Sequence, residues 1–130
     1  TSPLSETVLQ KKSQFISMNG QAVFKTAVNC IVPAVKSALE ALNLDVKDVD
    51  YFIPHQANQR IIENARMRLK LTEDQVLMNL DKYGNTSAAS IPIVVSEYAA
   101  KNRFKKGDII ICTGFGAGFT WGVTVLKWAI

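Results

Sequence analysis

Residues 109–118 read Ile109-Ile110-Ile111-Cys112-Thr113-Gly114-Phe115-Gly116-Ala117-Gly118, and this stretch decides the fold. The β-branched, apolar run at 109–113 is typical of a strand buried on both faces near the middle of a sheet. A glycine-rich loop is predicted at 114–118. Residues 119–128 are rich in β-branched and aromatic side chains and predict a last strand. Helical patterns alternate with the strands, so the chain is predicted to have an α/β layered fold.

Three helices are predicted from the spacing of apolar residues upstream of this stretch. The first covers residues 24–42 and is expected to kink or break at Pro33, which lacks a backbone donor. A short strand at 51–53 precedes the second helix, at 58–69. The third helix, at 86–103, opens with small residues.

Four shorter segments complete the prediction for residues 1–130, a length that fits one domain or one half of a larger one. Residues 1–14 have mixed polarity and are expected to form a loop, followed by a short strand at 15–17. The capping-box pattern at 72–75 predicts a helical turn. Residues 76–80 predict a second short strand. No internal repeat or linker divides the chain.

Composition and charge exclude several classes of protein. The net charge is +4, and the Lys and Arg residues are spread along the chain without interleaved aromatic residues, so no nucleic-acid partner is expected. No apolar run approaches the roughly 20 residues that cross a bilayer, so no membrane partner is expected. Cys30 and Cys112 lie in apolar runs and are interpreted as buried thiols of a protein in the reducing cytoplasm.

The single histidine lies in the segment Pro54-His55-Gln56-Ala57-Asn58-Gln59-Arg60, between a predicted strand and a predicted helix. Ligands bind at the carboxyl ends of strands in open α/β sheets. A neutral imidazole there can donate one hydrogen bond, and its pKa lies near working pH. The alternative interpretation is a histidine that merely caps the next helix.

The segment Tyr83-Gly84-Asn85-Thr86-Ser87-Ala88-Ala89-Ser90 joins a turn to the small residues of a helix start. Gly84 allows a turn with positive φ. Asn85 is therefore expected to project its amide near a helix N-terminus, where the partial charge is positive. The alternative interpretation is an ordinary asparagine in a turn or N-cap.

The glycine-rich loop at 114–118 raises the question of nucleotide binding, because it follows a strand. The dinucleotide fingerprint needs G-x-G-x-x-G leading into a helix. Here the third glycine comes one residue early, a strand is predicted next, and no P-loop lysine follows. Nucleotide binding is therefore excluded, although such a loop can bring backbone N–H groups close to a developing oxyanion.

In their order and spacing these segments resemble the C-terminal half of β-ketoacyl-acyl carrier protein synthase III, one of the thiolase-like condensing enzymes. The resemblance extends from about Phe15 to Trp128. The matching blocks are Met18–Gly20 with Val23–Lys25, Pro54–Asn58 with Arg60, Gly84–Ser90, and Phe115–Gly122. The resemblance implies the C-terminal half of a thiolase-like layered fold, with a mixed sheet packed with helices.

The resemblance also implies a Cys-His-Asn triad, in which His55 and Asn85 match the family histidine and asparagine. In the family, acetyl-CoA or another short acyl-CoA acylates the cysteine. Malonyl-acyl carrier protein then loses CO₂, and its enolate attacks the acyl-enzyme. The family cysteine belongs to the N-terminal half and matches neither Cys30 nor Cys112. The chain alone is therefore expected to be inactive, with no cofactor and no metal.

Further residues are assigned by the same resemblance. The substrate and CoA positions that it implies are Gly20, Phe24, Ala57 and Asn58. Ala117 matches the backbone donor to the acyl-enzyme oxyanion, where many relatives have glycine, and its methyl group is expected to narrow the acyl pocket. Arg60 matches a basic residue that docks the acidic carrier protein. Arg66 and Arg68 lie on the same predicted helix and either extend that patch or form a solvated helix face.

The implied partners are acyl carrier protein, a short acyl-CoA, the N-terminal half of the same enzyme and a second copy in a homodimer. Two alternative functions remain open at this point. One is a related acyltransferase of secondary metabolism, which transfers acyl groups to oxygen or nitrogen. The other is a non-catalytic half that binds CoA or carrier protein.

Overall fold

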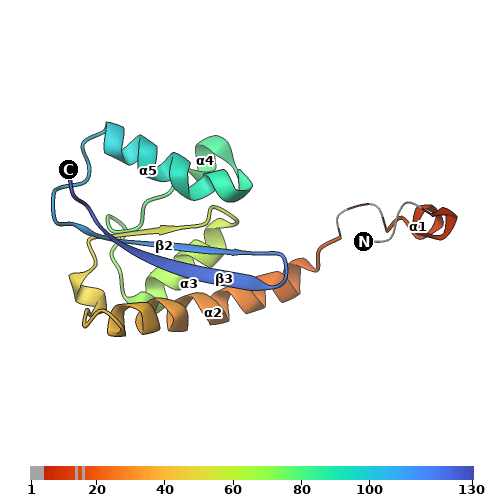
Figure 1. The fold of residues 1–130 in the computed structure, drawn as a ribbon, viewed down its shortest axis with the longest axis horizontal. Helices are drawn as coiled ribbons and strands as arrows, with labels where there is room; N and C mark the ends of the chain where they lie inside the picture. Colours follow the sequence, from red (N-terminus) through yellow and green to blue (C-terminus); the bar gives the residue numbers. More distant parts are fainter. Residues whose placement is uncertain (1–4, 14, 16) are drawn as a thin grey trace.

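A mixed sheet forms the centre of the molecule (Figure 1). In this computed structural model, residues 5–13, 15 and 17–130 are described. The strands are β1 (Tyr51–Pro54), β2 (Ile109–Gly116) and β3 (Thr120–Lys127), in the order β1-β2-β3. β1 runs parallel to β2, whereas β2 and β3 are antiparallel. The predicted α/β class with a mixed sheet is confirmed.

Helices cover both faces of this sheet. The helices on one face are α2 (Gly20–Glu40) and α3 (Gln59–Leu69), and those on the other are α4 (Leu80–Tyr83) and α5 (Ser90–Ala100) (Figure 1). Phe52 and Ile111 point into the core with α2 and α3. Their strand neighbours Ile53 and Ile110 point into the second core, with α5. Burial on both faces explains why residues 109–113 are apolar without alternation.

The long helix α2 packs on the sheet through residues spaced four apart. Its buried residues are Ala27, Ile31, Val32, Val35 and Leu39. The helix is continuous through Pro33, which is exposed, so of the two expected outcomes, a kink or a break, the break does not occur. By length and composition alone α2 could cross a membrane, but its stripe of core residues is the pattern of an amphipathic helix in a globular core.

Two predictions for the N-terminal segment need revision. Residues 1–14 were expected to form a loop, but α1 (Glu6–Gln10) is a short helix, and the Ser5 side chain accepts a hydrogen bond from the Val8 N–H. Such an N-cap is what a serine before a helical turn supplies. The strand expected at 15–17 falls partly on residue 16, which lies outside the described residues. Phe15 and Ser17 belong to no strand.

The strand predicted at 76–80 is reduced to one bridge. Val76 bridges Phe52 in parallel, and the Phe52 N–H donates to the Gln75 carbonyl at 2.7 Å. The chain then leaves the sheet, because the Asn79 N–H donates to a side chain, Gln56 Oε1, rather than to a strand. The expected turn at 72–75 is present, since the Val76 N–H donates to the Glu73 carbonyl.

The predicted glycine loop is mostly strand. β2 continues through Gly114 to Gly116, because β3 pairs with it as far as Gly116 opposite Thr120. Only residues 117–119 form the turn of this hairpin. The last strand is confirmed. Short 3₁₀ helices, η1 (Val46–Asp48) and η2 (Ser87–Ala89), precede β1 and α5, so the helix expected at 86–103 begins with a 3₁₀ turn.

Candidate active site

The histidine and the asparagine singled out in the sequence line the same pocket, which has a volume of about 370 Å³. Its wall consists of His55, Asn85, Ser87, Ala88, Ile91, Gly114, Phe115 and Gly116. The pocket lies where β1 and the hairpin end approach the start of α5. No residue of this wall carries a formal charge while His55 is neutral, so polar recognition there depends on neutral donors and acceptors.

His55 directly follows β1 and is held by backbone and ring contacts. Its N–H donates to the Thr113 carbonyl at 2.7 Å, which extends the parallel pairing of β1 with β2. Its ring meets Phe115 edge to face, with centroids 5.4 Å apart and an interplanar angle of 80°. Burial lowers the pKa of His55 below 6.5, so the imidazole is neutral at pH 7. Neither ring nitrogen has a hydrogen-bond partner among the described residues.

Asn85 is positioned by a turn that only glycine adopts readily. Gly84 has φ 65° and ψ −157°, which confirms the predicted positive φ. An added Cβ at Gly84 would meet no atom within 4 Å, so the backbone conformation, not crowding, favours glycine there. Asn85 Oδ1 accepts a hydrogen bond from the Ser87 N–H at 2.9 Å. This contact fixes which amide atom faces Ser87 and leaves the Asn85 NH₂ group as a free donor.

The arrangement offers two neutral N–H donors to one small pocket. Preorganised donors of this kind stabilise an oxygen on which negative charge develops during a reaction. A neutral imidazole also avoids binding a carboxylate too tightly, since it carries no full positive charge. The pocket is therefore suited to reactions that pass through an oxyanion or enolate.

Three other predicted residues follow wall residues closely in the sequence but do not form the wall themselves. The Ala57 N–H donates to the His55 carbonyl at 2.9 Å. Asn58 caps α3, its Oδ1 accepting from the Arg60 N–H at 2.8 Å. Ala117 lies in the hairpin turn, next to Gly116 of the wall, and its carbonyl accepts from Thr120 Oγ1.

Gly20 and Phe24, predicted to bind CoA, lie in the first turns of α2 and not on the wall of the pocket. Gly20 opens the helix, and Phe24 is 37% exposed. Among the described residues, the structure does not bring them together with His55 and Asn85. Their exposure means that a ligand or another segment can reach them.

The three arginines of α3 differ in their contacts. Arg60 is exposed and forms no ion pair with the described residues. Arg66 pairs with Glu63 and also donates to the Leu71 carbonyl at 3.1 Å, and its side chain is only 20% exposed. Arg68 donates to the Val28 carbonyl of α2. Among the described contacts, Arg60 is therefore the one of these three whose guanidinium makes none, while Arg68 is exposed and uses a single donor.

Neither cysteine has the environment of a nucleophile. Burial raises the pKa of Cys112 to about 11. Burial also raises the pKa of Cys30, whose Sγ contacts the Ala27 carbonyl. A reactive thiol needs a lowered pKa. Cys112 is buried, as predicted, whereas Cys30 is only partly buried, and neither thiol has the lowered pKa of a nucleophile.

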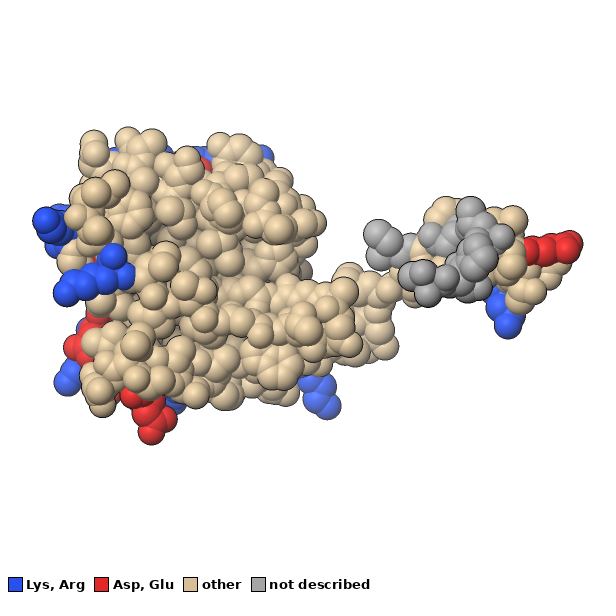
Figure 2. All heavy atoms as spheres, viewed as in Figure 1, with Lys and Arg blue, Asp and Glu red and all other residues tan. Residues whose placement is uncertain are grey.

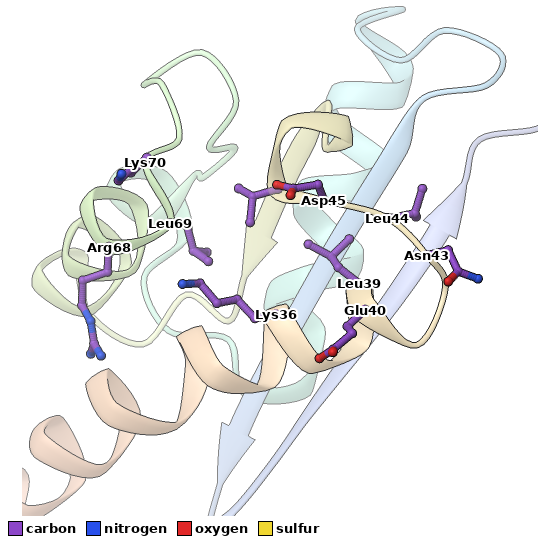
Figure 3. A pocket seen from close by; sticks show the side chains of 10 residues that line it. Lys36, Leu39, Glu40, Asn43, Leu44, Asp45, Arg68, Leu69 and Lys70 are labelled. Carbon is purple, nitrogen blue, oxygen red and sulfur yellow. The ribbon is translucent and has the colours of Figure 1, made fainter.

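A larger pocket of about 580 Å³ lies between α2, η1 and the end of α3 (Figure 3). Side chains of both charges line it, including Lys36, Glu40, Asp45 and Lys70. His55 and Asn85 do not contribute to it. Size alone does not identify a site, so we place the candidate site in the smaller pocket, whose wall includes both His55 and Asn85.

One feature near the pocket was missed from the sequence. Gln56 is 1% exposed, and its amide joins the segment that carries His55 to the segment that carries Asn85. The sequence shows Gln56 only as a polar residue shortly after an apolar strand, and this does not reveal which groups its amide would bond.

Comparison with solved structures places this fold among the thiolase-like condensing enzymes. The β-ketoacyl-[acyl carrier protein] synthase III of Thermus thermophilus matches 87% of this chain and 35% of its own, with a TM-score of 0.84 and 46% identity. The 3-oxoacyl-(acyl carrier protein) synthase III of Pseudomonas aeruginosa covers 100% of this chain and 41% of its own, with a TM-score of 0.87 and 33% identity.

The chain belongs to the 3-oxoacyl-[acyl-carrier-protein] synthase III family, whose C-terminal family model matches residues 39–128. The β-ketoacyl-[acyl-carrier-protein] synthase III of Caldanaerobacter subterraneus subsp. tengcongensis is 53% identical over 98% of this chain and 38% of that protein. The corresponding protein of Clostridium novyi is 45% identical over 97% of this chain and 40% of its length. The chain thus spans about two fifths of these relatives. The predicted family is confirmed.

Proposed function

We propose that this chain supplies the histidine and the asparagine of a decarboxylating β-ketoacyl-acyl carrier protein synthase III. The observation that carries the proposal is the pocket in which His55 and Asn85 each offer an unpaired N–H donor. The proposed reaction joins acetyl-CoA, or another short acyl-CoA, to malonyl-acyl carrier protein. Its products are the β-ketoacyl carrier protein, free CoA and CO₂.

The two donors act in the decarboxylation step. When the malonyl thioester loses CO₂, the electron pair of the broken C–C bond becomes an enolate, with negative charge on the thioester oxygen. Donors from His55 and Asn85 stabilise that oxygen, and one such donor contributes about 3–4 kcal/mol, or roughly 100- to 1000-fold in rate. The enolate carbon then attacks the acyl group on the cysteine, which the N-terminal portion of the family carries, and the thiolate leaves.

Neighbouring residues take supporting roles in this proposal. The Ala117 N–H stabilises the acyl-enzyme oxyanion from the hairpin turn beside the pocket. Ala57 and Asn58, which follow His55, contact the phosphopantetheine arm. Gly20 and Phe24 of α2 line a CoA tunnel that the N-terminal portion completes. No cofactor or metal takes part, and acyl-CoA and malonyl-carrier are substrates.

The N-terminal portion of the same enzyme is the first proposed partner. Figure 2 shows one face of the molecule, on which charged side chains lie at the rim and the middle is uncharged. Trp121 and Leu126 of β3 are 52% and 39% exposed. Exposed apolar groups of this kind favour burial against another protein surface.

A homodimer located in the cytoplasm is the assembly that we propose.

Reconstitution tests the proposed function. The complete enzyme means here this chain joined to the N-terminal portion of a synthase III, such as the Caldanaerobacter relative. Acetyl-CoA and malonyl-acyl carrier protein are expected to give β-ketoacyl carrier protein and CO₂ in equal amounts, whereas the 130-residue chain alone is expected to give neither. Acyl transfer to oxygen or nitrogen without CO₂ release would favour the secondary-metabolism alternative. Binding of CoA or carrier protein without any transfer would favour the non-catalytic one.

Arg60→Glu is expected to raise the KM for malonyl-acyl carrier protein in the complete enzyme by about 10-fold, because it reverses a charge that faces an acidic partner. The KM for acetyl-CoA is expected to stay unchanged. Steady-state kinetics at low and at high salt measure both values, and the effect should shrink at high salt. Arg66→Gln is the comparison, because the Arg66 guanidinium already pairs with Glu63 and a glutamine adds no third carboxylate beside Glu63 and Glu73. Equal changes in both KM values would contradict a docking role for Arg60.

A further inference from the structure

The side chain of Gln56 bridges two segments of the candidate site. Its Nε2 donates to the Pro54 carbonyl at 2.7 Å, in the residue before His55. Its Oε1 accepts from the Asn79 N–H at 3.2 Å, directly before α4. Both ends of the amide are thus used, inside the protein. Burial makes these bonds hard to replace, because water cannot satisfy the partners if the amide is removed.

The segment from Asn79 to Asn85 connects the residue that Gln56 holds to the wall of the pocket. The Asn79 carbonyl accepts from the Lys82 and Tyr83 N–H groups, at 3.0 and 3.2 Å. The Gly84 N–H donates to the Leu80 carbonyl at 2.9 Å. One tight helical turn therefore connects Asn79 to the glycine that orients Asn85. Because these hydrogen bonds hold the turn together, a displacement of Asn79 would displace Asn85 as well.

A second contact holds Asn79 from the side of α5. Asn79 Nδ2 donates to Glu97 Oε2 at 2.9 Å, and Glu97 also pairs with Lys82 and Lys101. These hydrogen bonds lower the pKa of Glu97 to about 2, so this carboxylate is ionised at neutral pH. Asn79 is thus fixed by Gln56 through its backbone and by Glu97 through its side chain.

We propose that Gln56 is a positioning residue, which sets the placement of Asn85 relative to His55 by tying the end of β1 to the start of α4. This proposal rests on the proposed function, since it concerns the same pocket. Gln56 is not on the wall of that pocket, so it acts through the other two residues. A carboxamide suits the role because it offers one donor and one acceptor at a fixed separation.

Gln56→Leu in the complete enzyme is expected to lower malonyl-carrier decarboxylation by about 10- to 100-fold, because small errors in the placement of reacting groups are costly. The KM for malonyl-acyl carrier protein and the acylation of the cysteine are expected to be retained. Gln75→Leu is the matched control. Its Nε2 donates to the Val49 carbonyl and its Oε1 accepts from the Thr72 N–H, away from the pocket. Gln75→Leu is expected to leave decarboxylation unchanged.

Gln56→Glu tests whether Gln56 acts through its hydrogen bonds or only through the volume that its side chain fills in the core. An ionised carboxylate in place of the amide would turn an oxygen, not a donor, toward the Pro54 carbonyl, whereas a protonated carboxyl restores the donor. Burial raises the pKa of such a carboxyl. The decarboxylation rate of Gln56→Glu, divided by that of the unchanged enzyme, is therefore expected to rise as the pH falls from about 8 to about 6. The division cancels the pH dependence that the two proteins have in common.

The outcomes separate this proposal from the one on which it rests. If His55→Ala abolishes decarboxylation but Gln56→Leu does not change it, the positioning role is overturned and the proposed function stands. If His55→Ala leaves decarboxylation at its full rate, the proposed function fails. If Gln56→Leu does not fold, a pH-independent ratio for Gln56→Glu overturns the positioning role, and a ratio that rises toward low pH supports it.

Discussion

His55→Ala is expected to lower malonyl-carrier decarboxylation by the complete enzyme by about 100- to 1000-fold, and Asn85→Ala by a similar factor. Each variant removes one N–H donor from a pocket with an uncharged wall, so no neighbouring cation compensates. Acylation of the cysteine by acetyl-CoA is expected to remain measurable in both variants, since that step does not form the enolate. Release of CO₂ from labelled malonyl-carrier and trapping of the acyl-enzyme measure the two steps separately.

Asn85→Asp is the decisive companion variant. The aspartate has almost the same volume and keeps an oxygen that can accept from the Ser87 N–H, but it replaces the free NH₂ group by a second acceptor. If donation matters, Asn85→Asp loses as much activity as Asn85→Ala. A variant of either residue that condensed at the unchanged rate would refute the assignment of that residue. Asn102→Asp makes the same exchange at an exposed position after α5, where the backbone is left-handed and accepts either residue, so it is the control and is expected to have no effect on decarboxylation.

The sequence was sufficient to predict the layers of the fold because burial leaves a periodic trace. The run at 109–113 lacks alternation because both faces of β2 are covered, and α2 and α3 show apolar residues every three or four positions. The pocket also had a local signal. His55 follows a strand directly, and Gly84 precedes Asn85, so each turn was predictable from a few adjacent residues.

Contacts between segments far apart in the sequence could not be predicted, because they produce no periodic pattern in it. The glycines at 114 and 116 suggested a loop, but pairing with β3 keeps them in a strand, which only the partner strand reveals. Val76 has the composition of a strand residue and makes a single bridge, because the chain turns away to meet Gln56. The ion pair that occupies Arg66 depends on the rotamers of two side chains, and no local pattern encodes it.

The strand that carries His55 is also where the largest loss of stability is expected. Phe52 is fully buried, pairs with Ile111 in the neighbouring strand and packs in the core formed with α2 and α3. Its backbone binds the chain on the other side as well, since the Leu77 N–H donates to the Phe52 carbonyl at 3.0 Å. Substitution by alanine therefore leaves a cavity in a place where the backbone is held on both sides and cannot easily collapse.

Phe52→Ala is expected to lower the free energy of unfolding of the complete enzyme by about 3–5 kcal/mol, measured by urea unfolding. Phe52→Leu keeps more of the buried volume and should lose clearly less. Met67→Ala is the control, because Met67 is 57% exposed on α3 and is expected to change stability by less than about 0.5 kcal/mol. If Phe52→Ala were no more destabilising than Met67→Ala, β1 would not be the anchored strand described above. The fixed placement of His55, three residues further along, would then need another cause.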